Sequence, residues 1–277
     1  MIINSKDLLK QAQNHAFAFP HFNFWDSNSI RADIAAAEKL QLPVILAWAQ
    51  KHSSEIGIED ALMLGKFYGS KAKVPVVLHL DHGTDPELVK WGAKNGFSSV
   101  MIDESDKDFD ENVRITKDVT KLAHSLGLSV EAEIGHVGDN NSEDHSKYTE
   151  VDAAKSFAKL TSVDSLAVSI GTSHGVYKAG TPKINFDRLQ DLKSNVKIPL
   201  VLHGGSSSGD ANLTKAAEFG ITKVNIYTDL ANTSLKATTA KKFENETDMA
   251  NYQRLQMQKL CEHYYSVFKT YKYQYQV

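Results

Sequence analysis

Three histidines stand at the ends of separate apolar segments, where they could reach one another in a folded chain. His82 follows the run VPVVLHLD, His174 follows SLAVSIGTS and His203 follows IPLVL. Asp81 lies directly before His82. Three imidazoles that converge from different strands, with an acid beside one of them, form a tris-histidine metal site that leaves coordination positions open for a substrate. Zinc is the metal that we expect there.

Glycine-rich turns at the same segment ends indicate a second kind of chemistry. The segment GTSHGVYK presents Gly175 and Lys178, and HGGSSSG presents Gly204, Gly205 and Ser206 ahead of a helix. Backbone N–H groups in such turns, together with the N-terminus of the helix, can hold a phosphate. Ordinary turns are an equally good interpretation of HGGSSSG taken by itself, and Lys178 favours the phosphate site.

The elements that must position these residues are short apolar runs that alternate with segments of helical apolar spacing. Continuous apolar strands that alternate with helices indicate a parallel sheet, and eight such units fit a closed (β/α)8 TIM barrel. Two longer helical stretches within about 230–277 then form a C-terminal helical extension, packed on the barrel or on a partner subunit. The eight strand candidates are residues 16–24, 43–49, 74–82, 98–105, 129–137, 165–175, 198–209 and 223–230.

A barrel of this kind carries its chemistry at the C-terminal ends of its strands. Further polar residues lie at such ends: Asp103 closes the fourth strand, Glu133 lies late in the fifth, and Asn225 and Thr228 lie in the eighth. Because the chain has 11 histidines, any single one is more simply explained as a core or capping residue. Their placement at successive strand ends makes a common site the better interpretation.

The composition limits the class of protein. The chain has 277 residues, of which 42% are hydrophobic and 23% charged, which is enough for one large core and a single domain over residues 1–277. Its net charge of −3, without a long basic run, indicates no nucleic-acid partner. No apolar run is long enough for a membrane span. Cys261 stands alone and no signal-peptide pattern is present, so we expect a cytoplasmic location.

The same motifs resemble those of the class II, zinc-dependent fructose/tagatose-bisphosphate aldolases. LHLDH, MIDES, VEAEIG, SLAVSIGTSHGVYK, LVLHGGS and KVNIYTDL look like the successive strand-end motifs of this family, in consistent order from about Asn4 to Asp229. The resemblance implies a (β/α)8 barrel that assembles as a homodimer or homotetramer and acts on a small sugar phosphate.

The resemblance also implies roles for individual residues. Zinc would be held by His82, His174 and His203, with Asp81 as the acid/base group. Asp103 and Glu133 would lie beside the metal, where they can hold it in an alternative position. Some members also bind a monovalent cation, Na⁺ or K⁺, near the same glycines. The phosphate of dihydroxyacetone phosphate would be bound by Gly175, Lys178, Gly204, Ser206, Asn225 and Thr228.

Cleavage of a ketose between C3 and C4 gives a reason for a strand to end on Asp81 and His82. The resulting carbanion is tolerable only as an enediolate whose oxygens a metal can bind. Because the C4 hydroxyl loses its proton as the bond breaks, a carboxylate must stand within hydrogen-bond reach of it. Neighbours on a regular strand point to opposite faces, so we expect Gly83 to permit the turn that lets both face the substrate.

Return of a proton to the enediolate requires a mobile acid, which the resemblance places on the loop after the fifth strand. That loop, GHVGDNNSEDHSKYTE, departs from the family pattern, because Asp139 stands where a second glycine is common. We assign the acid to Glu143. A solvated loop carboxylate without a catalytic role is the alternative.

The part of the site that would receive the aldehyde also departs from the family. Members that act on bisphosphates carry other residues, arginine among them, where this chain has Ala49, Tyr227 and Ala231, and none of these three is cationic. Fructose or tagatose bisphosphate is the usual family substrate, but these departures favour a ketose 1-phosphate or a related sugar acid phosphate. The residues that we expect to set specificity at the mouth are Asn23, Trp25, Asp26, Trp48 and Tyr227.

Two other functions stay open at this stage. A catalytically silent phosphosugar-binding protein could use the same scaffold, although binding alone has no need for Asp81 beside the three histidines. A metal-dependent sugar-phosphate epimerase or isomerase would interconvert substrates without releasing a triose phosphate.

Overall fold

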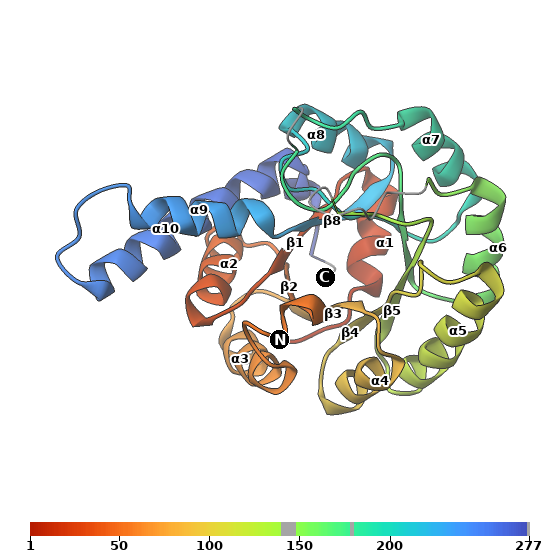
Figure 1. The fold of residues 1–277 in the computed structure, drawn as a ribbon, viewed down its shortest axis with the longest axis horizontal. Helices are drawn as coiled ribbons and strands as arrows, with labels where there is room; N and C mark the ends of the chain where they lie inside the picture. Colours follow the sequence, from red (N-terminus) through yellow and green to blue (C-terminus); the bar gives the residue numbers. More distant parts are fainter. Residues whose placement is uncertain (140–147, 178–179, 276–277) are drawn as a thin grey trace.

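The eight predicted strands form a closed parallel barrel. The computed structural model describes residues 1–139, 148–177 and 180–275 (Figure 1). Each strand pairs with the next in sequence order, and the last pairs with the first, so the sheet has no edge. The strands are β1 Phe19–Asn23, β2 Val44–Ala49, β3 Val76–Gly83, β4 Ser99–Ile102, β5 Ser129–Ile134, β6 Ser165–Val168, β7 Leu200–Leu202 and β8 Ile221–Ile226.

Helices connect the strands and surround the barrel (Figure 1). The alternation of strands and helices confirms the predicted (β/α)8 architecture. None of the described helices is both long and apolar enough to cross a membrane. The helices are α1 Lys6–His15, α2 Ser27–Leu40, α3 Ile58–Lys71, α4 Pro86–Asn95, α5 Phe109–Ser125, α6 Val151–Thr161, α7 Phe186–Asn195, α8 Asp210–Phe219, α9 Thr228–Thr238 and α10 Glu246–Val267, with short 3₁₀ turns η1 Gln50–His52 and η2 Thr270–Lys272.

Several strands are shorter than predicted, and in β6 and β7 glycines follow the early end. β6 stops at Val168, although the apolar run continues to residue 175, and β7 covers only Leu200–Leu202 of the predicted 198–209. Gly171 and Gly204 follow these strands with φ of 113° and 66°, which lie in a region that favours glycine and does not continue a strand. The polar residues of these motifs therefore lie in loops at the C-terminal ends of the strands.

The interior of the barrel changes from apolar to polar along its axis. At the N-terminal end, α1 packs Leu8 and Leu9 against Phe19 and Val77. Because alternate residues of a strand share a face, the next inward positions are His21 and Asn23 on β1, and His79 and Asp81 on β3. Outward-facing residues of the same strands, such as Phe22, Leu78 and Leu80, belong to the large apolar core beneath the helices. Full burial of each such side chain stabilises the fold by roughly 1.5–3 kcal/mol.

The C-terminal extension packs on the barrel, which is one of the two predicted arrangements; the other was packing on a partner subunit. α9 and α10 form a hairpin that projects from one side of the barrel, drawn in blue in Figure 1. α10 lies against α2 and α9. The hydroxyl of Tyr265 donates to the carbonyl of Pro43 at 2.8 Å, and its ring meets Phe22 edge-on with centroids 6.0 Å apart.

Asp229 joins this hairpin to the turn after β7. Its carboxylate accepts hydrogen bonds from the backbone N–H and the hydroxyl of Ser207, at 2.8 and 2.9 Å. It also accepts one from the hydroxyl of Tyr264 on α10. The glycine-rich turn is therefore fixed to the C-terminal helix through one partly buried carboxylate.

Candidate active site

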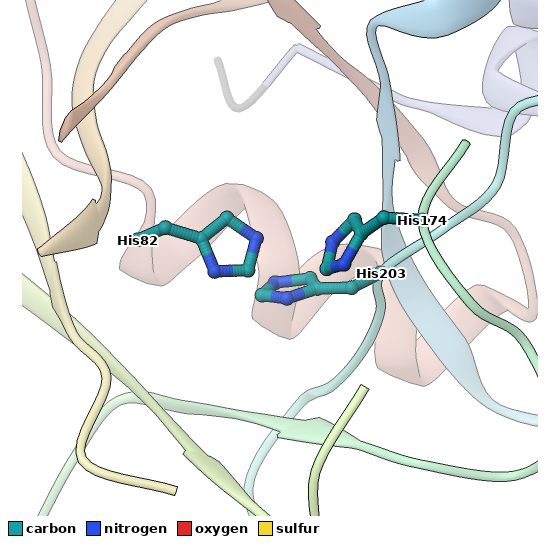
Figure 2. A group of neighbouring side chains, drawn as sticks. All are labelled: His82, His174 and His203. Atoms are coloured by element: carbon teal, nitrogen blue, oxygen red, sulfur yellow. The ribbon is translucent and has the colours of Figure 1, made fainter. Parts of the chain in front are cut away.

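The three predicted histidines meet at the C-terminal end of the barrel. His82 comes from the end of β3, His174 from the loop after β6 and His203 from the position after β7. Figure 2 shows their rings facing a common point, and their potential ligand nitrogens all lie within 4.8 Å of one another. The ring of His82 lies 4.9 Å from that of His174 and 4.4 Å from that of His203, measured between centroids.

Carboxylates determine which nitrogens of these rings are available. His82 Nδ1 lies 3.0 Å from Asp103 Oδ2, and His203 Nε2 lies 3.0 Å from Glu131 Oε1. Because an ionised carboxylate can only accept, the imidazole nitrogen is the donor in both pairs, which leaves His82 Nε2 and His203 Nδ1 as possible ligands. His174 Nε2 is buried and has no hydrogen-bond partner, whereas His203 Nδ1 is buried and has the carboxylate of Glu133 3.0 Å away. This donor set fits a tetrahedral metal ion with an open position.

A second group of ligands overlaps the first. His82, Asp103 and Glu133 also bring possible ligand atoms within 4.8 Å of one another. Oε2 of Glu133 lies 3.0 Å from Nδ1 of His203. The residues predicted to hold a displaced metal are thus adjacent to the tris-histidine group.

Charges around the histidines differ from ring to ring. Burial, together with the neighbouring His82 and Lys51, holds the pKa of His174 well below its usual value, so this imidazole is neutral, the state in which histidine can bind a metal. Burial also opposes a charge on His203, but the adjacent carboxylates of Glu131 and Glu133 outweigh it and raise its pKa to about 9. A positive charge is therefore stabilised at this position, and a bound cation would take the place of the proton.

The end of β3 is bent by His82 itself. Its backbone has φ 47°, in the left-handed region, and the register of β3 with β4 shifts between Leu80 and Gly83. Gly83 does not have a positive φ, so the prediction that Gly83 makes the turn is wrong. A Cβ at Gly83 would lie 2.7 Å from the carbonyl oxygen of Met101, so glycine is required for close packing instead. The bend brings Asp81 and His82 to the same cavity.

Asp81 is held between two asparagine amides. Asn23 Nδ2 donates to its Oδ2 at 2.9 Å, and Asn225 Nδ2 donates to its Oδ1 at 3.1 Å. Burial raises the pKa of this carboxyl, but His82, His21 and Lys223 outweigh burial and hold the pKa well below its usual value. Asp81 is therefore an ionised acceptor, which is the state that a general base requires.

One cavity of about 310 Å³ contains these groups. It brings together Asp81, two of the three histidines and most of the predicted phosphate-binding residues that the structure describes. The described residues that line it are Asn23, Lys51, His52, Asp81, His82, Asp139, His174, Gly175, Val176, Gly204, Ser206, Asn225, Tyr227 and Thr228.

The part of the cavity that was predicted to bind a phosphate is built from the turn after β7 and the start of α9. The hydroxyl of Ser206 accepts from the backbone N–H groups of Tyr227 and Asp229, both at 3.3 Å. Gly204 approaches Ser173 so closely that a Cβ would lie 2.5 Å from its carbonyl oxygen. Thr228 is the first residue of α9, whose N-terminus favours an anion.

Gly205 does not fit its predicted role. Its N–H donates to the carbonyl oxygen of Asn225 at 3.2 Å and is therefore engaged within the protein. A Cβ at this position would meet Val224 and the same carbonyl oxygen, at 2.4 and 2.9 Å. Gly205 is needed for packing between β7 and β8, and it does not line the cavity.

The lining of the cavity also includes aromatic rings and a lysine. The ring of Tyr227 lies 4.1 Å from that of His52 and 5.7 Å from that of Trp25, measured between centroids. His52 is buried with its Nδ1 unpartnered, and burial, aided by the charge of Lys51, lowers its pKa to about 4. Lys51 is exposed and lines the same cavity.

Comparison with known proteins identifies the family. A family model described as class-II fructose-bisphosphate aldolase matches residues 3–272. The chain belongs to this family. It is accordingly a class II aldolase, a carbon–carbon lyase, on a TIM barrel.

Individual relatives of this aldolase cover nearly the same length. The Escherichia coli K12 protein YdjI, described as uncharacterized, is 38% identical over 230 residues, 82% of either chain. Its crystal structure, described as that of the YdjI aldolase, matches with a TM-score of 0.88 and 33% identity over 97% of both chains. A candidate fructose-1,6-biphosphate aldolase from Coccidioides immitis gives a TM-score of 0.87 at 27% identity over 95% of both chains.

Two of the residues expected to set specificity lie away from the cavity of the aldolase. Trp48 is completely buried beneath the helices, where its Nε1–H donates to the carbonyl of Ile56 at 2.9 Å. It pairs with Leu80 on β3, whereas its neighbours Ala47 and Ala49 pair with the inward-facing His79 and Asp81. Strand alternation therefore turns Trp48 outward, and its predicted place at the mouth is wrong.

Asp26 is the N-cap of α2 rather than a wall of the cavity. Its carboxylate accepts from the backbone N–H groups of Asn28 and Ser29, and the Ser29 hydroxyl binds back to complete a capping box. Asn23, Trp25 and Tyr227 do lie at or beside the cavity.

Some residues that line the cavity were not predicted. Lys51 and His52 lie in the short η1 turn that follows β2, and their position after a strand end alone could have suggested them. Glu131 stands two residues before Glu133 and so shares its inward face. Lys178 and Glu143 lie outside the described residues.

The capping role of Asp26 gives a direct test. We expect Asp26→Ala to lower the free energy of unfolding by about 1 kcal/mol, the usual loss for an N-cap, without changing the aldehyde preference of the aldolase. Urea unfolding and kcat/KM for two aldehydes measure these quantities. The matched control is Asp187→Ala, an exposed aspartate in the first turn of α7. A change of substrate preference in Asp26→Ala alone would contradict the assignment.

Proposed function

We propose that this aldolase is zinc-dependent and reversibly cleaves a ketose phosphate between C3 and C4, to give dihydroxyacetone phosphate and an aldehyde. One observation carries the proposal: an ionised Asp81, held by Asn23 and Asn225, lines the same cavity as His82 and His174, which form a possible metal-binding group with His203. The name of the YdjI structure as an aldolase supports it.

The zinc ligands would be His82, His174 and His203, with Asp103 and Glu133 available for a displaced ion. A bound zinc ion would supply Lewis-acid stabilisation of the negative charge that develops as the C3–C4 bond breaks. Asp103 and Glu131 orient the rings of His82 and His203 for this purpose.

Asp81 would accept the proton of the C4 hydroxyl as the bond breaks, and return it in the direction of synthesis. Its two oxygens are already held by Asn23 and Asn225, so the carboxylate is oriented before substrate binds. Glu143 would be the mobile acid that protonates the other fragment.

The phosphate of dihydroxyacetone phosphate would lie over the turn after β7 and the N-terminus of α9. Gly175, Gly204, Ser206 and Thr228 line this end of the cavity, Lys178 would add a charge, and Asn225 would contact the substrate. Na⁺ or K⁺ would bind near the same glycines. We also propose that the chain acts as one domain, in a cytoplasmic homodimer or homotetramer.

The aldehyde end favours a ketose 1-phosphate over a bisphosphate. Among the described residues that line the cavity, Lys51 is the only lysine or arginine, and it is exposed. A second phosphate would have no arginine among them, and each charge-assisted hydrogen bond is worth roughly 1.5–3 kcal/mol. Tyr227 and His52 present apolar ring faces together with single polar atoms, which suit a hydroxylated aldehyde.

Metal removal should abolish activity while preserving the fold, because the closed sheet and its core do not depend on the ion. We expect chelated protein to lose aldol cleavage, to keep its circular dichroism spectrum and to regain activity with zinc. His174→Ala and His203→Ala should behave like the chelated protein. Full-rate cleavage by protein shown to be metal-free would disprove zinc dependence.

Asp81→Ala should bind substrate and zinc but cleave it slowly. Loss of a general acid/base group usually lowers the rate by roughly 10² to 10⁴. Release of dihydroxyacetone phosphate, followed with a coupled assay, measures the effect, and Asp118→Ala on the surface is the control. Near-normal turnover would remove Asp81 from the mechanism, and interconversion of ketoses without triose release would indicate an epimerase.

The aldehyde preference should appear in kcat/KM. In the direction of synthesis we expect glyceraldehyde to be preferred over glyceraldehyde 3-phosphate, where each tenfold ratio corresponds to about 1.4 kcal/mol. Lys51→Met should reduce any remaining activity with the phosphorylated aldehyde and leave that with glyceraldehyde nearly unchanged. Kinetics that strongly favour a ketose 1,6-bisphosphate over every 1-phosphate would overturn the preference but not the aldolase assignment.

A further inference from the structure

Lys223 on β8 is a cation in the interior of the barrel, below the active-site cavity. It is 1% exposed, and among the described residues it is the only lysine or arginine that is buried. Its Nζ donates to Oδ1 of Asn225 at 2.8 Å and lies 3.1 Å from Oε1 of Glu131. Removal of an ammonium from water costs several kcal/mol unless partners compensate for it. Both partners of Lys223 are in turn bonded to working residues of the site.

The first connection leads to the metal ligands. Oε1 of Glu131, which Lys223 contacts, also accepts from Nε2 of His203 at 3.0 Å. This bond fixes the ring of His203 and leaves Nδ1 as the nitrogen that can bind a metal. Lys223 therefore holds the carboxylate that orients His203.

The second connection leads to the base. A side-chain amide can be turned either way, with its oxygen or its nitrogen toward Asp81. Because Lys223 donates to the oxygen of Asn225, the nitrogen must face the other way, and it donates to Asp81 Oδ1 at 3.1 Å. The reverse orientation would place the carbonyl oxygen of Asn225 against a carboxylate oxygen.

Other interior groups cannot replace this charge. His21 and His79 are completely buried near Lys223, and burial together with the charge of Lys223 lowers both pKa values, that of His79 to about 4. Nδ1 and Nε2 of His21 and Nε2 of His79 have no hydrogen-bond partner. Burial thus disfavours a charge on both imidazoles, whereas Lys223 makes direct polar contacts with Glu131 and Asn225.

We propose that Lys223 is a positioning residue that orients His203 for the metal and Asp81 for the C4 hydroxyl at the same time. The inference rests on the proposed function, because it assumes the zinc site and the role of Asp81. It assigns Lys223 no contact with the substrate: the side chain acts only through Glu131 and Asn225.

Zinc affinity tests the first connection without measuring turnover. In Lys223→Met, which keeps an unbranched side chain one atom shorter, the affinity measured by competition with a chromophoric chelator should fall by up to roughly tenfold. This is the lower end of the roughly 10- to 100-fold loss for a direct partner of a metal ligand, because Lys223 acts through Glu131. The effects of Lys223→Met and Glu131→Gln on affinity should be strongly non-additive in the double variant. The control is Lys6→Met, which removes the ion pair of Lys6 with Asp164 and should leave the affinity unchanged.

Turnover at saturating zinc tests the second connection. We expect Lys223→Met to lower kcat at least tenfold under these conditions, and to lower it little further when Asn225 has already been replaced by leucine. Simple loss of packing would instead lower kcat by similar factors in both backgrounds. The two cycles together separate positioning from a general structural role.

Each outcome decides a different claim. Wild-type zinc affinity and kcat in Lys223→Met, or additive effects in both cycles, would overturn the inference and leave the proposed function intact. If Lys223→Met does not fold, Glu131→Gln, which preserves shape, should by itself weaken zinc binding about tenfold, and unchanged affinity would overturn the inference. A wild-type protein that neither binds zinc nor releases triose phosphate would overturn the proposed function as well.

Discussion

The closed parallel barrel imposes one constraint on which the site depends: alternate residues of every strand face inward, and all strands end around the same mouth. Residues far apart in the sequence, such as His82 and His203, therefore become neighbours. The same constraint explains the small residues of β2. Ala47 and Ala49 pair with His79 and Asp81, so they leave room inside the barrel for an imidazole and a carboxylate.

The charge of the interior is consistent with a bound cation. Asp81, Glu131 and Glu133 are buried carboxylates, and Lys223 is the only buried lysine or arginine among the described residues. Buried charges require compensation, and a divalent ion at the histidines would supply it. The metal site and the polar interior are thus parts of one electrostatic arrangement. Removal of the cations would leave the carboxylates buried without compensation, and removal of the carboxylates would do the same to the cations.

Sequence patterns predicted the fold and the centre of the site because both follow from simple periodicity. Apolar runs alternating with helices specified the barrel, and polar residues at strand ends specified Asp81 and His82. Strand alternation would also have turned Trp48 outward had it been applied to β2.

Other features required three-dimensional information. The capping role of Asp26 depends on where α2 begins, and the positive φ of His82 depends on the register shift between β3 and β4. Lys51 and His52 reach the cavity from the short η1 turn, which the sequence pattern did not predict. Glu143 stays a prediction, since it falls outside the described residues.

Asp229 connects the turn that is proposed to bind the phosphate with the C-terminal hairpin. The same carboxylate holds Ser207 of the glycine-rich turn and Tyr264 of α10. A ligand that moves this turn would also change the hydrogen bond between Asp229 and Tyr264 on the hairpin. A molecule that binds the hairpin and moves Tyr264 would change the bonds between Asp229 and the turn. Because such coupling is reciprocal, any contact on α10 that changes phosphate affinity by a given factor is itself strengthened or weakened by phosphate to the same extent. The hairpin would in this sense be an allosteric site for the substrate pocket.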